Sequence, residues 1–290
     1  MHIVHGDEIA PRVISGHRTG DIKFQRLLQG DPDRPDNYEL SLVRNSGKYF
    51  TPRHRHNFEQ FRMILEGEFS WATRKTMKLG QVGYFPEGTH YGPQNVANCL
   101  TLTLQCAGPS GEGFLSYDQL HQGHEEMRRL GSFEDGIFRR APGANTPAAK
   151  KNQDGYEAIW EHVRGRRLSY PKKRYEEPVI MTPQALDWDT SETPGVGRKL
   201  LGMFDHEARC ELYRLEAGAQ LPIEASRAIQ LLFVLDGSGR ADASAWRRWS
   251  AIEIPKGSRA VLRADTASEI LRLGIAVVPE GTQIARSRAA

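Results

Sequence analysis

The chain has 290 residues, with 39 Lys and Arg against 36 Asp and Glu, for a formal net charge of +3. A charge this small for the length predicts neither nucleic acid nor a membrane surface as a partner. The hydrophobic share of 39% and the charged share of 26% are ordinary for a folded globular protein, which excludes disordered and fibrous classes. Three cysteines are too few for a disulfide framework. The first residues show no secretory signal pattern, and no apolar stretch is long enough to span a bilayer, so we expect a cytoplasmic location.

In chain order, residues 1–35 are polar and are expected to form an N-terminal segment. From residue 36 to about 110, short β-rich runs are punctuated by Gly and Pro, which predicts a first all-β domain. Within it, LTLTLQ at 100–105 alternates apolar and polar residues and predicts a strand buried on one face. Cys99 and Cys106 lie in or beside this run and are expected to be small core residues.

Residues 111–195 have a different texture and predict a helical linker. Apolar residues recur at three- and four-residue spacings in 117–131 and 153–165, and both stretches end at Gly, so each predicts a short helix. The intervening 141–152 and the basic stretch 164–177 are interpreted as solvated linker. A second β-rich domain is expected over 196–280, followed by a polar tail at 281–290.

The pattern that carries chemistry lies in GKYFTPRHRHNFEQF and GQVGYFPEGTHYG. On a strand, side chains at even offsets share a face, so His54, His56 and Gln60 are predicted to point the same way. Two imidazoles on one face can bind the same ion. His90 follows the tight turn at 86–88 and is the expected third donor.

These two segments resemble the two cupin motifs, in which a His-x-His pair, a Glu and a later His bind one divalent metal inside a small β-barrel. The resemblance implies that His54, His56 and His90 are metal ligands, with Gln60 at the glutamate position. It also implies an all-β fold of two jelly-roll cupin barrels in tandem, joined by the helical linker. Glu59 is the alternative to Gln60 if the strand bulges; in an unbroken strand it faces away, so we favour Gln60.

Besides the replacement of the glutamate by Gln60, the sequence departs from the motif in its spacing: His90 follows Gly88 by two residues, where three is usual.

The second β-rich block repeats the pattern without its histidines. When IQLLFVLDG is aligned with EQFRMILEG, the positions of His54, His56, Gln60 and His90 correspond to Glu224, Ser226, Gln230 and Arg259. A guanidinium repels a cation, so we expect a structural second barrel, a pairing of Glu224 with Arg259, and one metal per chain.

Other residues near the predicted site are candidates for substrate contact. Arg62 shares the parity of the ligands and can orient an anion if it points inward; the alternative is that it reaches solvent at the strand end. Tyr84 can donate a hydrogen bond to a ligand, although packing in the barrel wall is the simpler interpretation. Both are candidate catalytic residues. Phe61, Met63 and Leu65 make the opposite face of the strand apolar, so the partner barrel or a second subunit, giving a homodimer, must cover it. His121 and His124, which share a helix face, are interpreted as surface or packing residues.

These observations predict a metal-dependent cupin enzyme. Neutral imidazoles and a carboxamide leave the charge of the ion uncompensated, which favours a chelating anionic substrate. The leading hypothesis is an oxygenase or dioxygenase that acts on a small anionic, enolic or phenolic substrate, with Fe(II) favoured and Zn, Ni, Mn or Cu as alternatives. The alternative is a non-redox metal- or small-ligand-binding cupin, or a metal-dependent lyase or isomerase.

Overall fold

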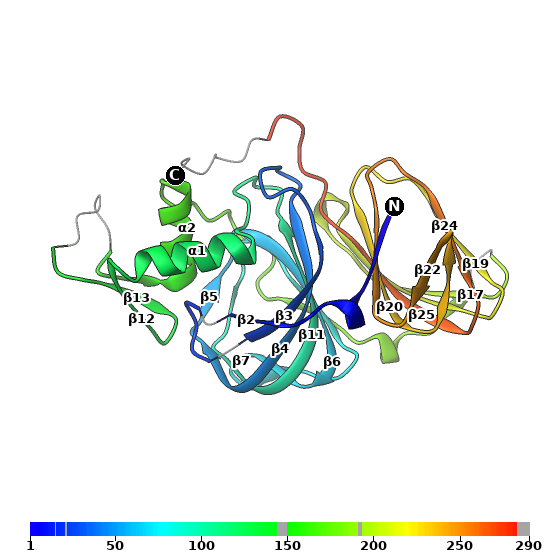
Figure 1. The fold of residues 1–290 in the computed structure, drawn as a ribbon, viewed down its shortest axis with the longest axis horizontal. Coiled ribbons are helices and arrows are strands. Elements are labelled where there is room, and N and C mark those ends of the chain that lie inside the picture. Colours follow the sequence, from blue (N-terminus) through cyan, green and yellow to red (C-terminus); the bar gives the residue numbers. More distant parts are fainter. Residues whose placement is uncertain (15, 21, 144–149, 191–192, 283–290) are drawn as a thin grey trace. The chain divides into compact units, whose positions relative to one another are not determined.

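The computed structural model describes residues 1–14, 16–20, 22–143, 150–190 and 193–282. It is drawn in Figure 1. The contacts within the chain define two compact units. The first-barrel unit consists mainly of 11–24 and 29–180, and the second-barrel unit of 1–10, 25–28 and 181–279. No helix in the described ranges is long and apolar enough to cross a membrane.

The first-barrel unit is built on a sheet with the strand order β15-β9-β6-β11-β4-β3-β2. Its strands are β2 (Arg12–Ile14), β3 (Ile22–Gln29), β4 (Tyr38–Thr51), β6 (Phe58–Gly67), β9 (Val82–Phe85), β11 (Gln94–Ala107) and β15 (Val179–Met181). Two short antiparallel pairs complete it: β5 (His54–Arg55) with β10 (His90–Tyr91), and β7 (Phe69–Ala72) with β8 (Lys75–Met77). The mostly β architecture confirms the predicted fold class.

The strand predicted from LTLTLQ is the centre of β11, and both of its faces are buried. Leu102 and Leu104 lie on one face, while Thr101 and Thr103 are equally inaccessible on the other. The two threonines line a cavity inside the barrel. Polar residues on a strand therefore mark the interior of this barrel rather than its solvent side. Cys99 and Cys106 are buried free thiols, as expected.

Residues 111–143 and 150–178 form a helical cap on the first barrel, where we had expected a linker. The cap contains α1 (Tyr117–Met127), α2 (Gly155–Arg164) and the strands β12 (Gly131–Glu134), β13 (Ile137–Arg140) and β14 (Asn152–Asp154). Figure 1 shows the two helices lying side by side, next to β5. Both helices lie within the ranges that the sequence predicted.

Local sequence explains where the two helices begin and end. The Ser116 side chain caps α1, and Gln119 closes a capping box with it. Asp154 caps α2 by accepting hydrogen bonds from the first backbone amides of the helix, and Gly165 ends it with φ of 65°. Their apolar faces join Phe58 of β6 in one buried cluster that includes Ile159 and Trp160. This shared core attaches the cap to the barrel.

Part of the basic stretch 164–177 packs against the same unit, while Arg167, Lys172 and Lys173 are exposed. Arg164 is buried, the Arg55 guanidinium lies 4.0 Å from the centre of the Tyr170 ring, and Arg174 forms an ion pair with the buried Glu59. Arg164 and Arg174 therefore belong to the interior of the unit, while the other charges of the stretch lie at its surface. Of the other predicted linker, 141–152, residues 144–149 lie outside the described part of the chain.

The second-barrel unit has two facing sheets. One has the order β1-β23-β20-β25-β18-β17-β16 and the other β19-β24-β21-β22. Their strands are β1 (His2–His5), β16 (Asp189–Thr190), β17 (Val196–Met203), β18 (Arg209–Leu215), β19 (Gln220–Ile223), β20 (Gln230–Asp236), β21 (Ser238–Ala241), β22 (Ser244–Arg247), β23 (Ser250–Ile254), β24 (Ala260–Ala264) and β25 (Ser268–Gly274). Short 3-10 turns lie at Gly6–Glu8, Pro183–Ala185 and Asp205–Glu207. One apolar cluster, containing Leu232, Trp246 and Ile270, fills the space between the sheets.

The first residues of the chain belong to these sheets and are not a separate segment. Strand β1 pairs antiparallel with β23, with His2 opposite Glu253 and His5 opposite Ser250. Strands β2 and β3 pair with each other in the sheet of the first-barrel unit. The polar composition of 1–35 hides these strands, because each carries only a few apolar side chains.

Candidate functional site

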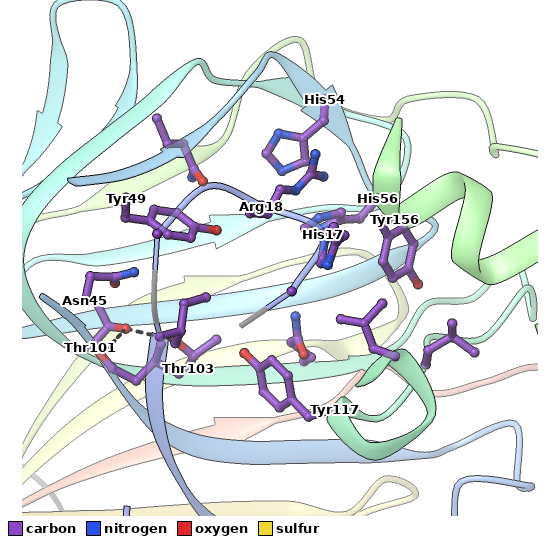
Figure 2. Close-up of a pocket in the computed structure, with 18 of the residues that line it drawn as sticks. His17, Arg18, Asn45, Tyr49, His54, His56, Thr101, Thr103, Tyr117 and Tyr156 are labelled. Atoms are coloured by element: carbon purple, nitrogen blue, oxygen red, sulfur yellow. Dashed lines mark hydrogen bonds between the residues drawn. The ribbon is translucent and has the colours of Figure 1, made fainter. Parts of the chain in front are cut away.

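A cavity lies inside the first-barrel unit, bounded by the inner faces of the strands and by the cap (Figure 2). The volume of the cavity is about 90 Å³. This size suits a small organic molecule. Among the described residues that line the cavity there is no Asp or Glu.

Two of the predicted metal ligands, His54 and His56, face this cavity. Their ring centroids are 4.9 Å apart. The Nδ1 of His54 lies 2.8 Å from the carbonyl oxygen of Pro52 and donates to it, which leaves Nε2 with a free lone pair. Burial, followed by the charge of Arg18, lowers the pKa of His54 to about 3. Burial also lowers the pKa of His56 well below its usual value, so both rings are neutral at physiological pH.

His90, the predicted third ligand, does not join them. Strand β10 pairs with β5 so that His90 is opposite Arg55 and Tyr91 is opposite His54. His90 is partly exposed, and its pKa is lowered by burial and then by the charges of Arg53 and Arg55.

Tyr91 takes the inward place instead. It stands three residues after Gly88, at the usual motif spacing, and its hydroxyl lies 2.9 Å from Nδ1 of His56. Because side chains alternate along a strand, the shift of one residue turns His90 away from the cavity.

Gln60 is fully buried but is not among the described cavity-lining residues. Its Oε1 accepts a hydrogen bond of 2.8 Å from Nε of Arg62. Arg62 does line the cavity, and its guanidinium lies 4.5 Å from the ring centre of Phe69, another lining residue. The Gln60 side chain therefore contacts Arg62.

Glu59 and Tyr84 lie away from the cavity. Glu59 is completely buried and pairs with Arg174; burial raises its pKa to about 7, although Arg174 opposes this shift. Tyr84 is hydrogen-bonded to the same pair and stacks on Phe61 with ring centroids 4.8 Å apart. Tyr84 is not among the described residues that line the cavity, because its strand position points to the other face of the sheet.

The segment before β3 supplies two cavity residues that the sequence analysis did not identify, His17 and Arg18. Arg18 makes a bidentate ion pair with Asp154, at 2.8 and 3.3 Å. Although burial raises it, the pKa of Asp154 is lowered overall by the Arg18 charge. Figure 2 shows the Arg18 side chain between His54 and His17. No motif marks this segment, and its contacts come from far along the chain.

The remaining polar lining comes from the strands and the cap. From β4 and β11 come Asn45, Tyr49, Gln94, Thr101, Thr103 and Gln105, and from the cap come Tyr117, His121, His124 and Tyr156. His121 and His124 therefore face the cavity rather than only the surface or the packing of the cap. For His124, its position one helical turn after Leu120 was the available signal. Gln94 is 1% exposed, and its Nε2 has no hydrogen-bond partner among the described residues.

Comparison with known proteins defines the fold. No family model matches the chain, and no curated protein matches it. Among solved structures, it is similar to a candidate dioxygenase from Nostoc punctiforme, with a TM-score of 0.61 and 9% identity over 99% of this chain and 87% of that one. Oxalate decarboxylase from Bacillus subtilis aligns with a TM-score of 0.55 and 14% identity over 94% and 76%. A protein from Geobacillus kaustophilus aligns with a TM-score of 0.55 and 12% identity over 95% of both chains.

The fold is that of a two-barrel cupin. The resemblance drawn from the motifs is thereby confirmed at the level of the fold. Identities this low show the fold and nothing further about activity.

The cupin metal set fits this barrel only in part. Of the four expected ligands, His54 and His56 line the cavity, while His90 and Gln60 are not among its described lining residues. Across the described ranges, no group of three or more His, Cys, Asp or Glu side chains is arranged to hold a metal ion. Tyr91 stands at the position of the third histidine, and the Arg18 guanidinium lies beside His54 (Figure 2). A ligand other than these side chains would have to complete any metal site.

In the second cupin barrel, the two end positions form the expected pair. Arg259 lies 3.3 Å from Glu224, and both side chains are exposed. Inside this barrel, Gln230 accepts a hydrogen bond from Arg272, and Arg272 lies 2.9 Å from the buried carboxylate of Glu211. An internal ion pair therefore occupies the interior position of the second barrel.

Proposed function

We propose that the first cupin barrel binds a small organic anion, such as an enolic or phenolic carboxylate, and acts on it. The observation that supports this proposal is the lining of the cavity. It contains two arginines and several histidines, and among the described lining residues no carboxylate. An anion entering this cavity meets donors and fixed positive charge without repulsion.

The two arginines of the cavity differ in how their charge is balanced. Arg18 is neutralised by Asp154. Arg62 has no carboxylate partner among the described residues, and its hydrogen bond to Gln60 leaves its charge in place. One fixed positive charge therefore remains for the ligand, which favours a monoanion. Gln94 supplies an unused donor, and the rings of Phe58 and Phe69 supply apolar walls for a planar molecule.

A metal-dependent oxygenase acting on the same kind of anion is the second candidate, and one contact favours it. The Nδ1 of His54 donates to the carbonyl of Pro52, and metal-bound histidines commonly carry such a backing hydrogen bond. His54 and His56 would hold the ion, which would polarise oxygens of the substrate when bound. Among the structural neighbours, oxalate decarboxylase has Mn(II) centres. Fe(II) remains the favoured ion, with Zn, Ni, Mn or Cu as alternatives; a metal-dependent lyase or isomerase is equally compatible with two histidines.

Ligand-induced thermal stabilisation tests the anion proposal. Benzoate, 2-hydroxybenzoate and acetoacetate are compared with their neutral amides. We expect at least one carboxylate to raise the melting temperature while its amide does not. Arg62→Met should abolish the rise in melting temperature. Arg44→Met is the control and should retain this rise, because it removes an exposed arginine that pairs with Glu66 on the same sheet. Equal stabilisation by amides, or no stabilisation by any carboxylate, would contradict the proposal.

The second candidate has its own test. Protein purified without a metal-affinity tag is analysed for metals, and apo-protein is loaded anaerobically with Fe(II) before oxygen uptake is measured with the same compounds. Bound metal that is lost in His54→Ala, together with oxygen uptake, would establish the oxygenase. Bound zinc or nickel without uptake would favour the lyase or isomerase, and absence of tight metal binding would leave the anion site as the function of the barrel.

A further inference from the structure

Gln60 stands where the cupin motif has a metal-binding glutamate, yet its contact is with an arginine. Its Oε1 accepts from Nε of Arg62 at 2.8 Å. The opposite orientation of the amide would set two donors against each other, so the hydrogen bond fixes which way the carboxamide points. Gln60 is 0% exposed, and this contact is therefore made away from water.

The contact also fixes the guanidinium of Arg62. Its Nε is held by Gln60, and its planar face lies over the Phe69 ring at 4.5 Å. With one edge and one face restrained, the terminal nitrogens are left to bind an anion, and a planar guanidinium binds a carboxylate through two parallel hydrogen bonds. Restraint before binding reduces the rotamer entropy that a flexible arginine would lose.

The second barrel provides an internal comparison. Gln230 occupies the position equivalent to Gln60, and it too accepts from an arginine, Arg272. There the guanidinium also pairs with the buried Glu211 at 2.9 Å. In the first barrel, no described carboxylate pairs with Arg62. In the second barrel, the arginine beside the glutamine therefore has a carboxylate partner, which it shares with Arg198, whereas Arg62 has none among the described residues.

We infer that Gln60 is a positioning residue for Arg62: a neutral side chain at the former metal-ligand position that orients the guanidinium without cancelling its charge, so that the first barrel recognises the carboxylate of a small planar monoanion. This inference rests on the proposed anion-binding function. A glutamate at this position would form an ion pair with Arg62 and remove the charge that the ligand needs. It would also remove a buried donor, because Nε2 of Gln60 has no partner among the described residues.

The experiment uses the full chain, 2-hydroxybenzoate as the probe and 2-hydroxybenzamide as its neutral control. Binding is measured by calorimetry in metal-free buffer, and thermal unfolding is recorded for each variant. We expect Gln60→Glu to weaken carboxylate binding by about tenfold or more, as loss of a charge-assisted hydrogen bond does. Its melting temperature should be unchanged or higher, since the new ion pair is satisfied. A weaker affinity for the carboxylate at an unchanged or higher melting temperature excludes unfolding as the cause of the lost binding.

Gln60→Met removes the acceptor without adding charge. This variant should weaken binding of 2-hydroxybenzoate less than Gln60→Glu does, and it should leave the small affinity for the amide unchanged. Gln230→Met is the matched control in the second barrel and should not alter probe binding.

If the wild-type protein binds the probe and Gln60→Glu binds it equally well, the positioning role is wrong while the anion site stands. If Gln60→Glu instead binds Mn(II) or Fe(II) more tightly than wild type, Gln60 is a latent metal ligand and the inference fails. If the wild-type protein prefers the amide or binds neither compound, the proposed function falls with it.

Discussion

The hydrogen bond between Tyr91 and His56 separates this barrel from a three-histidine cupin site. The Tyr91 hydroxyl lies 2.9 Å from Nδ1 of the buried His56, and the two rings meet nearly edge to face. The sequence could identify the motif around His90, but not its register. A change of one residue in strand register inverts which side chain points inward. That register is set by the pairing of two-residue strands, whose sequence signal is weak.

Tyr91→Phe should therefore destabilise the protein, and His90→Ala should not. Removing the hydroxyl leaves a buried ring nitrogen without its partner, which costs about 1–3 kcal/mol. His90 is partly exposed, so its removal should change the free energy of unfolding by less than about 0.5 kcal/mol. Urea denaturation measures both. Loss of ligand or metal binding in His90→Ala, with Tyr91→Phe unaffected, would restore the ligand set predicted from the motif.

The burial of Glu59 predicts a pH effect on stability. Its folded pKa of about 7 lies above the ordinary 4.5, so the folded state holds the proton more tightly than the unfolded chain. The stability that this provides is complete below pH 4.5 and is lost as the pH rises through 7. Between these limits, the unfolding free energy of wild type relative to Glu59→Gln should fall by roughly 3 kcal/mol. A difference that grows with pH would mean that attraction to Arg174 outweighs burial.

At the level of elements, the helical cap contributes to the site as much as the strands do. Periodicity and terminal glycines located α1 and α2, because amphipathic spacing is a local property. Amphipathic spacing could not show that the apolar faces of these helices dock on Phe58 of the first barrel, because docking depends on contacts between residues far apart in the sequence. His121 and His124 were therefore assigned to surface or packing. The break between β5 and β6 was missed for the same reason: the sequence predicted one strand carrying His54, His56 and Gln60 on a single face.

Ser116→Ala tests whether the cap supports the cavity. It removes the acceptor from the capping box of α1 and should cost about 1 kcal/mol, whereas Ser116→Gly should cost only a few tenths. Because Tyr117 and Leu120 of this helix line the cavity, ligand affinity should fall in the alanine variant more than in the glycine variant. Equal loss of stability in both would show that the cap bond contributes little.

At the scale of the whole molecule, the two barrels share a fold but not an interior. The first encloses a cavity lined by polar side chains, and the second places Arg272 and Glu211 at the equivalent depth. The sequence repeat predicted both the second barrel and its loss of histidines. It did not predict the internal ion pair, because Glu211 and Arg272 are on different strands and belong to neither motif.

Glu211→Gln should unfold the second barrel more easily and leave the first barrel intact. The Glu211 side chain is 1% exposed and that of Arg272 is 11% exposed. Removing the carboxylate leaves a buried guanidinium without its charge partner, which costs about 3–5 kcal/mol. Thermal unfolding should become biphasic, with probe binding retained after the first transition. A single transition that abolishes binding would mean that the two barrels unfold as one cooperative unit.

The pairing of β1 with β23 joins residues about 250 positions apart in the sequence, and this has a consequence for synthesis on the ribosome. Residues 2–5 are translated before the first-barrel unit, but their partner strand is translated after it. During translation the first barrel can complete its own sheet and core, while β1 remains an unpaired strand tethered to it. Closing so long a loop is slow relative to local pairing. Strand β1, although it is made before the first barrel, is therefore expected to reach its final place after that barrel has folded.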